Sequence, residues 1–212
     1  PLSGTTGIGH TRWATHGIPN EANAHPHANA HVAVVHNGII ENFQELKTAL
    51  EKDGDVFESD TDTEVIVHLV SRHLNDGATP REAAEKTVAA LEGAFALAMI
   101  FAGHGELLIG SRRGSPLAVG YGDGEMFIGS DALALAPLTR LISYLEDGDL
   151  VELSRDGATV YDGNGAKVSR AVQETAAIGD AVGKGNFAHY MLKEIYEQPT
   201  VIGDTLNSFF NP

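Results

Sequence analysis

The repeat of apolar residues changes its period at Gly93, from helical before it to extended after it. Upstream, apolar spacing predicts three helices, near residues 42–54, 61–75 and 79–91. Asn42 with Glu45 and Thr61 with Glu64 resemble capping boxes, and the third helix places Pro80 at its first position. A β-branched run from His31 predicts one earlier strand, which runs into a turn at Asn37-Gly38.

Downstream of Gly93 the apolar runs are short and separated by turn residues. They predict strands at residues 94–101, 106–110, 117–121, 125–129, 141–145, 149–153 and 158–161, with a short helix near 132–136. Helices followed by many strands indicate an α+β layered domain and not a doubly wound parallel sheet. Small and polar residues at 169–186 predict a linker, and Tyr190–Gln198 a further helix that Pro199 ends.

The chain is acidic and has no cysteine. It carries 14 Lys+Arg and 29 Asp+Glu, a net charge of −15, which argues against nucleic acid and against an anionic membrane as partners. Its longest apolar run, residues 94–102, is about half the length needed to cross a bilayer, and no signal segment opens the chain. We therefore expect a cytoplasmic protein without disulfides, thiolate metal ligands or a cysteine nucleophile within these residues.

Histidines are concentrated near the start of the chain, where His25-Pro-His27 could in principle bring two imidazoles to one metal ion. The region lacks the helical spacing of histidine and carboxylate that marks zinc enzymes. A His-Pro-His sequence is more typical of a loop. The sequence therefore predicts no metal site.

The segment His10-Thr-Arg-Trp-Ala-Thr-His-Gly17 has neither a helical nor a strand pattern, yet it is dense in polar and aromatic groups. Such a segment is typical of a ligand-binding loop. The planar fork of Arg12 fits a carboxylate, and Trp13, the one tryptophan, could form a lid or wall. The alternatives are an ordinary ion pair for Arg12 and a core position for Trp13.

Two further positions complete a candidate site. Asn37 offers a side-chain amide beside the unobstructed backbone of Gly38, which is what an oxyanion hole requires, although Asn-Gly is also a common turn. Asp62 precedes a predicted helix, where it could cap the helix or bind a substrate ammonium. A carboxylate binder, an ammonium binder and an oxyanion hole together fit an α-amino acid attacked at its side-chain carbonyl, and glutamine matches that description.

At these residues the chain resembles the class II, N-terminal-nucleophile amidotransferases, and in particular the glutaminase domain of glutamine:fructose-6-phosphate amidotransferase (glucosamine-6-phosphate synthase). The resemblance extends over nearly the whole chain, in the order of the family. The matching stretches begin at His10, Asn23, Val35, Ser59, Arg113 and Tyr190. The last of them, with Lys-Glu-Ile-Tyr-Glu-Gln-Pro, resembles the passage into a sugar-phosphate isomerase half.

The resemblance implies a four-layer αββα sandwich that hydrolyses glutamine to glutamate and ammonia. Ammonia would pass to fructose 6-phosphate in a second domain, with no metal or organic cofactor. Arg12 would bind the substrate carboxylate and Asp62 its ammonium, with Thr15 and His16 completing the pocket. Trp13 would belong to a loop that closes over glutamine, and Asn37 and Gly38 would form the oxyanion hole.

The resemblance also implies a missing part, because the family's nucleophile is an N-terminal cysteine about sixty residues before the His-Thr-Arg-Trp segment. Residues 1–186 would then be a glutaminase domain that lacks its first strands, and residues 187–212 a linker and the start of the isomerase half. We expect such a chain to form no glutamyl thioester. Exposed sheet edges would favour a homodimer.

The sequence leaves three other interpretations open. Pro1 could act as an N-terminal amine, although no pocket is evident near it. The chain could belong to a different class II amidotransferase, of purine or asparagine synthesis. It could also be a non-catalytic module that binds glutamine.

Overall fold

The computed structural model describes residues 4–13, 15–175 and 183–210 of the chain. Its contacts divide the chain into two compact units, Pro1–Thr175 and Ala176–Pro212. The described helices include none that is long and apolar enough to cross a membrane.

The first unit contains two sheets in which every described strand pair is antiparallel. The seven-stranded sheet has the order β1 (His27–Ala28), β2 (Val32–Ile40), β3 (Gly93–Phe101), β4 (Leu108–Arg113), β8 (Leu150–Ser154), β9 (Gly157–Tyr161) and β10 (Lys167–Val168). The four-stranded sheet has the order β11 (Gln173–Glu174), β7 (Leu141–Tyr144), β5 (Ala118–Tyr121) and β6 (Met126–Gly129). The predicted change of period at Gly93 is confirmed, since β3 begins there.

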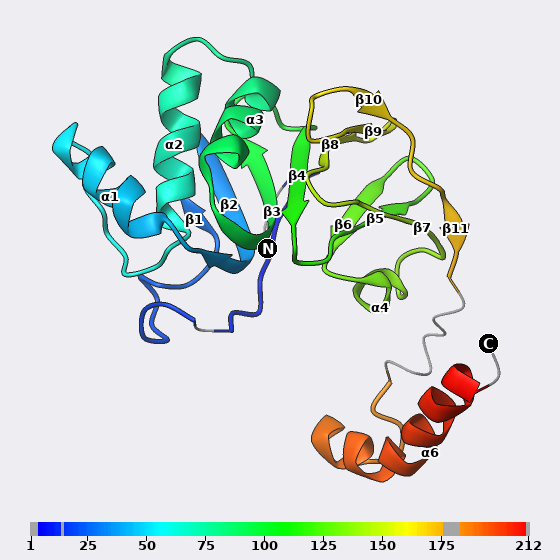
Figure 1. The fold of residues 1–212 in the computed structure, drawn as a ribbon. Helices are drawn as coiled ribbons and strands as arrows, with labels where there is room; N and C mark the ends of the chain where they lie inside the picture. The colour runs from blue at the N-terminus through cyan, green and yellow to red at the C-terminus, as the bar shows by residue number, and fades with distance from the viewer. Residues whose placement is uncertain (1–3, 14, 176–182, 211–212) are drawn as a thin grey trace. The chain divides into compact units, whose positions relative to one another are not determined.

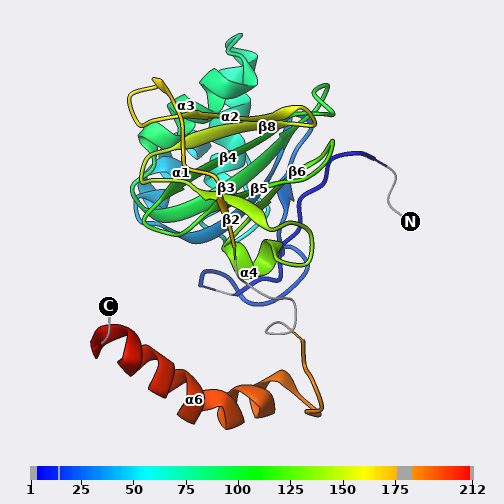
Figure 2. The ribbon, with the colours of Figure 1, turned by 90° about the vertical axis from the view of Figure 1, so that its right-hand side faces the viewer.

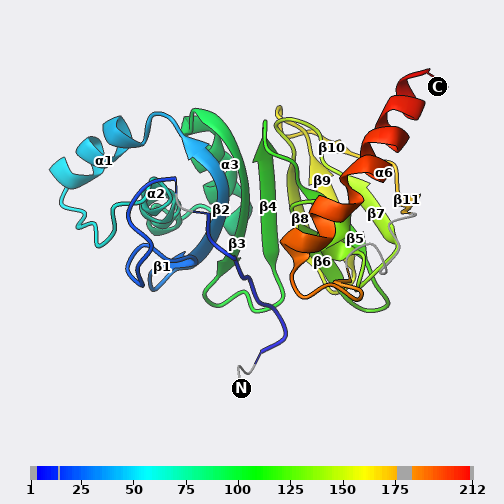
Figure 3. The same ribbon diagram turned by 90° about the horizontal axis from the view of Figure 1, so that it is seen from below.

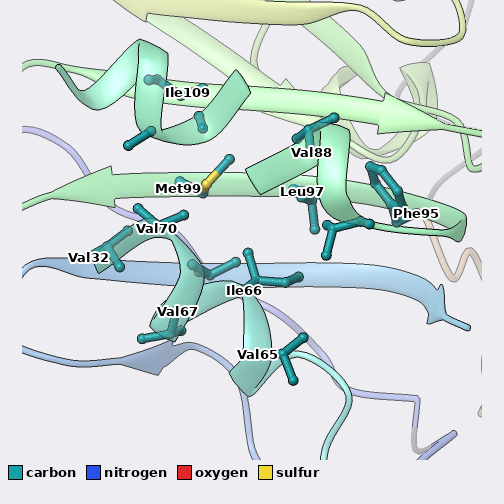
Figure 4. Packing of buried hydrophobic residues seen from close by; sticks show 14 of the residues in the cluster. Val32, Val65, Ile66, Val67, Val70, Val88, Phe95, Leu97, Met99 and Ile109 are labelled. Carbon is teal, nitrogen blue, oxygen red and sulfur yellow. The ribbon is translucent and has the colours of Figure 1, made fainter. Parts of the chain in front are cut away.

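Three helices pack on one face of the seven-stranded sheet. They are α1 (Phe43–Lys52), α2 (Glu64–Asn75) and α3 (Pro80–Ala90). Helix α2 contacts β1 and β2, and α3 contacts β4. Figure 1 and Figure 2 show these two helices on the same side of the sheet. In Figure 4 Ile66 and Val70 of α2 lie on the side of the helix that faces the strands. They belong to one buried cluster with Leu97 and Met99 of β3.

The other face of the seven-stranded sheet packs on the four-stranded sheet. Leu117, Val119 and Leu145 from the smaller sheet's side meet Val151 and Leu153 of β8 in a second buried cluster. The short helix α4 (Ala132–Leu135) covers part of the outer face of the smaller sheet, where Leu135 packs with Ile142 and Ala118. Figure 3 shows the order of these layers, with the three helices on the opposite side of β4 from β5 and β7.

The predicted capping pairs before α1 and α2 are wrong, because the side chains of Asn42 and Glu64 bond to other groups. Asn42 makes no side-chain cap; its amide donates to Ala90 O and accepts from Glu92 N. Glu64 accepts from the backbone of Glu58 and Ser59. At α3, in contrast, Thr79 and Glu82 cap each other's backbone as a capping box, and Pro80 is the first helical residue as predicted.

The turn predicted at Asn37-Gly38 is also wrong. Strand β2 continues to Ile40 and pairs with β3 through both residues, Asn37 opposite Ala96 and Gly38 opposite Phe95. Gly38 has φ +117°, and a Cβ there would collide with the Ala94 carbonyl. The glycine is therefore required by the close approach of β3, and not by a reversal of the chain.

Two predictions near the end of the chain need correction. The predicted linker at 169–186 contains β11, which pairs with β7, and residues 176–182 lie outside the described residues. The helix predicted to end at Pro199 continues as α6 (Tyr190–Phe210). Proline removes one backbone donor and has a φ that suits a helix, so the remaining turns continue past it.

Candidate functional site

One pocket of about 270 Å³ brings together most of the predicted site residues. Its lining comes from the loop at 10–15, the middle of β2 and the segment just before α2. The lining includes Arg12, Trp13, Thr15, Asn37, Gly38 and Asp62, together with His10, His25, His36, Ile39 and Thr63. His16 does not line this pocket, but its Nδ1 lies 3.8 Å from Asp62 Oδ1.

Asp62 is a buried residue of the pocket lining. It is 2% exposed, and its Oδ2 accepts a hydrogen bond of 2.8 Å from Ile40 N at the end of β2. Its Oδ1 lies 4.0 Å from His36 Nδ1. Thr63 is the N-cap of α2 and makes no side-chain cap, so the alternative that Asp62 caps this helix is wrong.

Arg12 adopts a backbone conformation that is costly for any residue other than glycine. Its φ is +60°, the one positive φ among the described non-glycine residues, and such strain is common at functional sites. Its Nη2 donates to His16 O at 2.6 Å, and its backbone N donates to His10 Nδ1 at 2.8 Å. The Nε is buried and has no hydrogen-bond partner among the described residues.

Trp13 lies at the rim of the pocket and is 89% exposed. The alternative that it fills the core is therefore wrong. Thr15 is also exposed and lines the same pocket. Both residues stand on the irregular loop that carries Arg12, so a movement of this loop would move all three.

The side-chain amide of Asn37 is hydrogen-bonded to one residue that precedes it in the sequence and to one that follows it. His10 Nε2 lies 2.7 Å from its Oδ1, and its Nδ2 donates to Ser130 Oγ at 3.0 Å. Sequence reasoning missed Ser130, because the two residues are 93 positions apart and no local pattern links them.

Four histidines, three of which line the pocket, form a group. His10 stacks on His25 with ring centroids 4.4 Å apart, and His27 meets His25 edge-on at 5.1 Å. Thr63 Oγ1 lies 3.1 Å from His25 Nε2 and 3.0 Å from His36 Nδ1. The described residues include no group of three His, Cys, Asp or Glu that could hold a metal ion.

Burial governs the protonation of this group. It lowers the pKa of His25 to about 3, helped by the positive charges that His10, His27, His36 and Arg12 can carry. Burial likewise lowers the pKa of His36 to about 4, although Asp62 opposes the shift. Both rings are therefore neutral at pH 7.

These shifts predict that the protein loses stability on mild acidification. Each lowered histidine binds a proton in the unfolded chain below about pH 6.5 but in the folded chain only near pH 3 to 4. Their contribution is thus complete above pH 6.5 and is lost as the pH falls toward those values. We expect the midpoint of thermal unfolding to fall between about pH 6.5 and 5, above the range in which ordinary carboxylates titrate.

A His25→Leu variant removes one of these groups and should flatten the slope in that window, whereas His31→Leu, at an exposed position, should not. Equal slopes in the wild type and in His25→Leu would contradict the assignment.

Comparisons with known proteins bear on the family of this chain. Residues 10–137 match the profile of a family described as "Glutamine amidotransferase domain". A glutamine–fructose-6-phosphate aminotransferase [isomerizing] of Gluconobacter oxydans is 58% identical over 212 residues, covering 100% of this chain and 35% of the relative. One of Bradyrhizobium diazoefficiens is 60% identical over 206 residues, covering 97% and 34%. The chain thus spans about a third of the length of these relatives.

Solved structures show the same fold. A glutamine phosphoribosylpyrophosphate amidotransferase of B. subtilis, complexed with ADP and GMP, matches with a TM-score of 0.62 and 26% identity over 73% of this chain and 34% of its own. A glutamine aminotransferase class-II domain protein of Silicibacter pomeroyi matches with a TM-score of 0.53 and 20% identity, over 71% of this chain and 74% of its own. The latter likeness bears on the fold alone.

Proposed function

The chain belongs to the glutamine amidotransferase family, and we propose that its pocket binds L-glutamine as part of the glutaminase domain of a glutamine–fructose-6-phosphate aminotransferase. One observation carries the proposal. A single pocket is lined by the guanidinium of Arg12 and the buried carboxylate of Asp62, the two charges that complement a free α-amino acid. The identity of 58% to the Gluconobacter oxydans enzyme favours this aminotransferase over other members of the family.

Each predicted residue has a role in this proposal. Arg12 binds the α-carboxylate through its guanidinium, and Asp62 binds the α-ammonium. Thr15 and His16 complete the pocket, and exposed Trp13 closes over the ligand. Asn37 and Gly38 supply donors to the oxygen of the side-chain carbonyl as it gains negative charge.

The nucleophile in this proposal is a cysteine outside the 212 residues, which contain none. Two features support a place for further strands and hence a complete αββα sandwich. The smaller sheet ends at β6, and Asn37, Gly38 and Ile39 of β2 are exposed. Residues 1–186 would then be most of a glutaminase domain, and 187–212 the start of an isomerase half that uses fructose 6-phosphate. We further propose a cytoplasmic homodimer that needs no cofactor.

The proposal predicts binding without turnover. In isothermal titration calorimetry the purified 212-residue chain should bind L-glutamine and should bind D-glutamine far more weakly. Arg12, Asp62 and the Asn37-Gly38 donors together contact three substituents of the α-carbon, and only one enantiomer can place all three correctly. A coupled ammonia assay should detect no release, and an electrophilic glutamine analogue should add no mass to the protein, since no thiol is present. Absence of L-glutamine binding would refute the assigned pocket, and release of ammonia would refute the need for an external cysteine.

A further inference from the structure

A continuous set of hydrogen bonds joins the Arg12 loop to Asn37 and to the loop after β6. It runs from Arg12 N to His10 Nδ1 (2.8 Å), from His10 Nε2 to Asn37 Oδ1 (2.7 Å) and from Asn37 Nδ2 to Ser130 Oγ (3.0 Å). His10 thus stands between the residue assigned to the substrate carboxylate and the residue assigned to the oxyanion. The function proposed above gives it no role.

The backbone N–H of Arg12 determines the donor and acceptor in each of these hydrogen bonds. A backbone N–H can only donate, so His10 Nδ1 accepts from Arg12 and carries no proton in the neutral ring. The proton is then on Nε2, which donates to Asn37. The Asn37 oxygen is consequently held toward His10 and its NH2 group toward Ser130, which takes one of the two hydrogens.

The orientation of the Asn37 amide matters because rotating it by 180° exchanges its oxygen, an acceptor, with its NH2 group, a donor. An oxygen facing a developing oxyanion would repel it, whereas the NH2 group stabilises it. The exposed face of β2 at Asn37 leaves the amide without close packing that would fix it. Its two polar partners must therefore set the orientation.

We propose that His10 is a positioning residue that holds the Asn37 amide in the orientation an oxyanion hole requires, and that it couples this orientation to the backbone of Arg12. This proposal rests on the function proposed above, because only that function makes Asn37 part of an oxyanion hole. The hydrogen-bond arrangement itself is independent of that function. Stacking of His25 on His10, with planes inclined by 22°, supports the ring in place.

Two substitutions of His10 separate its two bonds. His10→Gln places an NH2 group near the position of Nε2 and keeps a donor for Asn37. His10→Asn places an acceptor near the position of Nδ1 for Arg12 N, but its shorter side chain loses Asn37. His31→Gln and His31→Asn are matched controls at an exposed histidine whose ring is outside the site.

The test is nuclear magnetic resonance on the ¹⁵N-labelled 212-residue chain, with L-glutamine titration as a second arm. We expect the His10 ring to be neutral with its proton on Nε2. The Asn37 side-chain NH2 signals should move toward free-amide positions in His10→Asn and stay near wild type in His10→Gln. L-glutamine binding should weaken about fivefold in His10→Asn, the loss expected for one hydrogen bond, and much less in His10→Gln.

The outcomes are distinct. A proton on Nδ1 of His10, or equal displacement of the Asn37 signals in both variants, would overturn the positioning role and leave His10 as packing. A wild-type chain that shows the expected signals but binds no glutamine would refute the proposed function while the arrangement of His10 and Asn37 stands.

Discussion

An Arg12→Ala variant is expected to lose most of its affinity for L-glutamine, by about 2 kcal/mol or more, which is about a thirtyfold rise in Kd. The physical reason is that the α-carboxylate would enter a pocket whose Asp62 carboxylate is already buried, with no cation left to offset the repulsion. Arg12→Lys should recover part of the loss, because it restores the charge but not the planar fork. Calorimetry measures both effects.

Ligand analogues make this prediction specific to the carboxylate. Wild type should discriminate strongly against L-glutamine amide, which has no α-carboxylate, and Arg12→Ala should discriminate much less. Asp62→Asn keeps an acceptor for Ile40 N and should lose discrimination against N-acetyl-L-glutamine, which has no ammonium. Arg140→Ala, at an exposed arginine outside the pocket, is the control. Unchanged discrimination by Arg12→Ala would show that another group binds the carboxylate.

The second large effect is expected far from the pocket, where Arg170→Met should lower the free energy of unfolding by about 3–5 kcal/mol. Arg170 binds Asp149 with two hydrogen bonds of 2.7 Å, and Asp149 also accepts from Glu146 N at 2.7 Å. The Asp149 side chain is 1% exposed, so the substitution leaves a buried charge without its partner. Urea unfolding at pH 7 measures the change.

A second ion pair provides the control for this effect. Arg155 lies 3.7 Å from Glu106, and the two side chains are 53% and 69% exposed. Arg155→Met should therefore cost less than about 1 kcal/mol. The double variant Arg170→Met with Asp149→Leu should be more stable than Arg170→Met alone, because the unpaired charge is gone. Equal effects at Arg170 and Arg155 would show that burial of the pair is unimportant.

Local patterns in the sequence predicted those elements whose stabilisation is local. The helix α3 begins at Pro80 and ends at Ala90, close to the predicted bounds, because its capping contacts lie within four residues of its start. The apolar run at 94–101 predicted a strand for the same reason, since burial on both faces is visible in the run by itself. The short strands β1, β10 and β11 carry no such run and were missed.

Predictions failed where a side chain or a glycine serves a distant partner. Asn42 looks like a local cap, but it bonds to Ala90 and Glu92, 48 and 50 residues away. Gly38 looks like half of a turn, but it is a strand residue made necessary by the nearby Ala94 carbonyl of β3. No short window of the sequence contains both partners of either contact.

The same division holds for the site. The residue types alone, an arginine on an irregular loop, an aspartate before a helix and an Asn-Gly pair, indicated a pocket for an α-amino acid. Only the tertiary structure decided that β2 continues through Asn37 to Ile40, which bonds to Asp62, and that His10 and Ser130 hold the Asn37 amide. The functional group of a side chain is known from the sequence alone. Its orientation depends on hydrogen bonds between residues that only folding brings together.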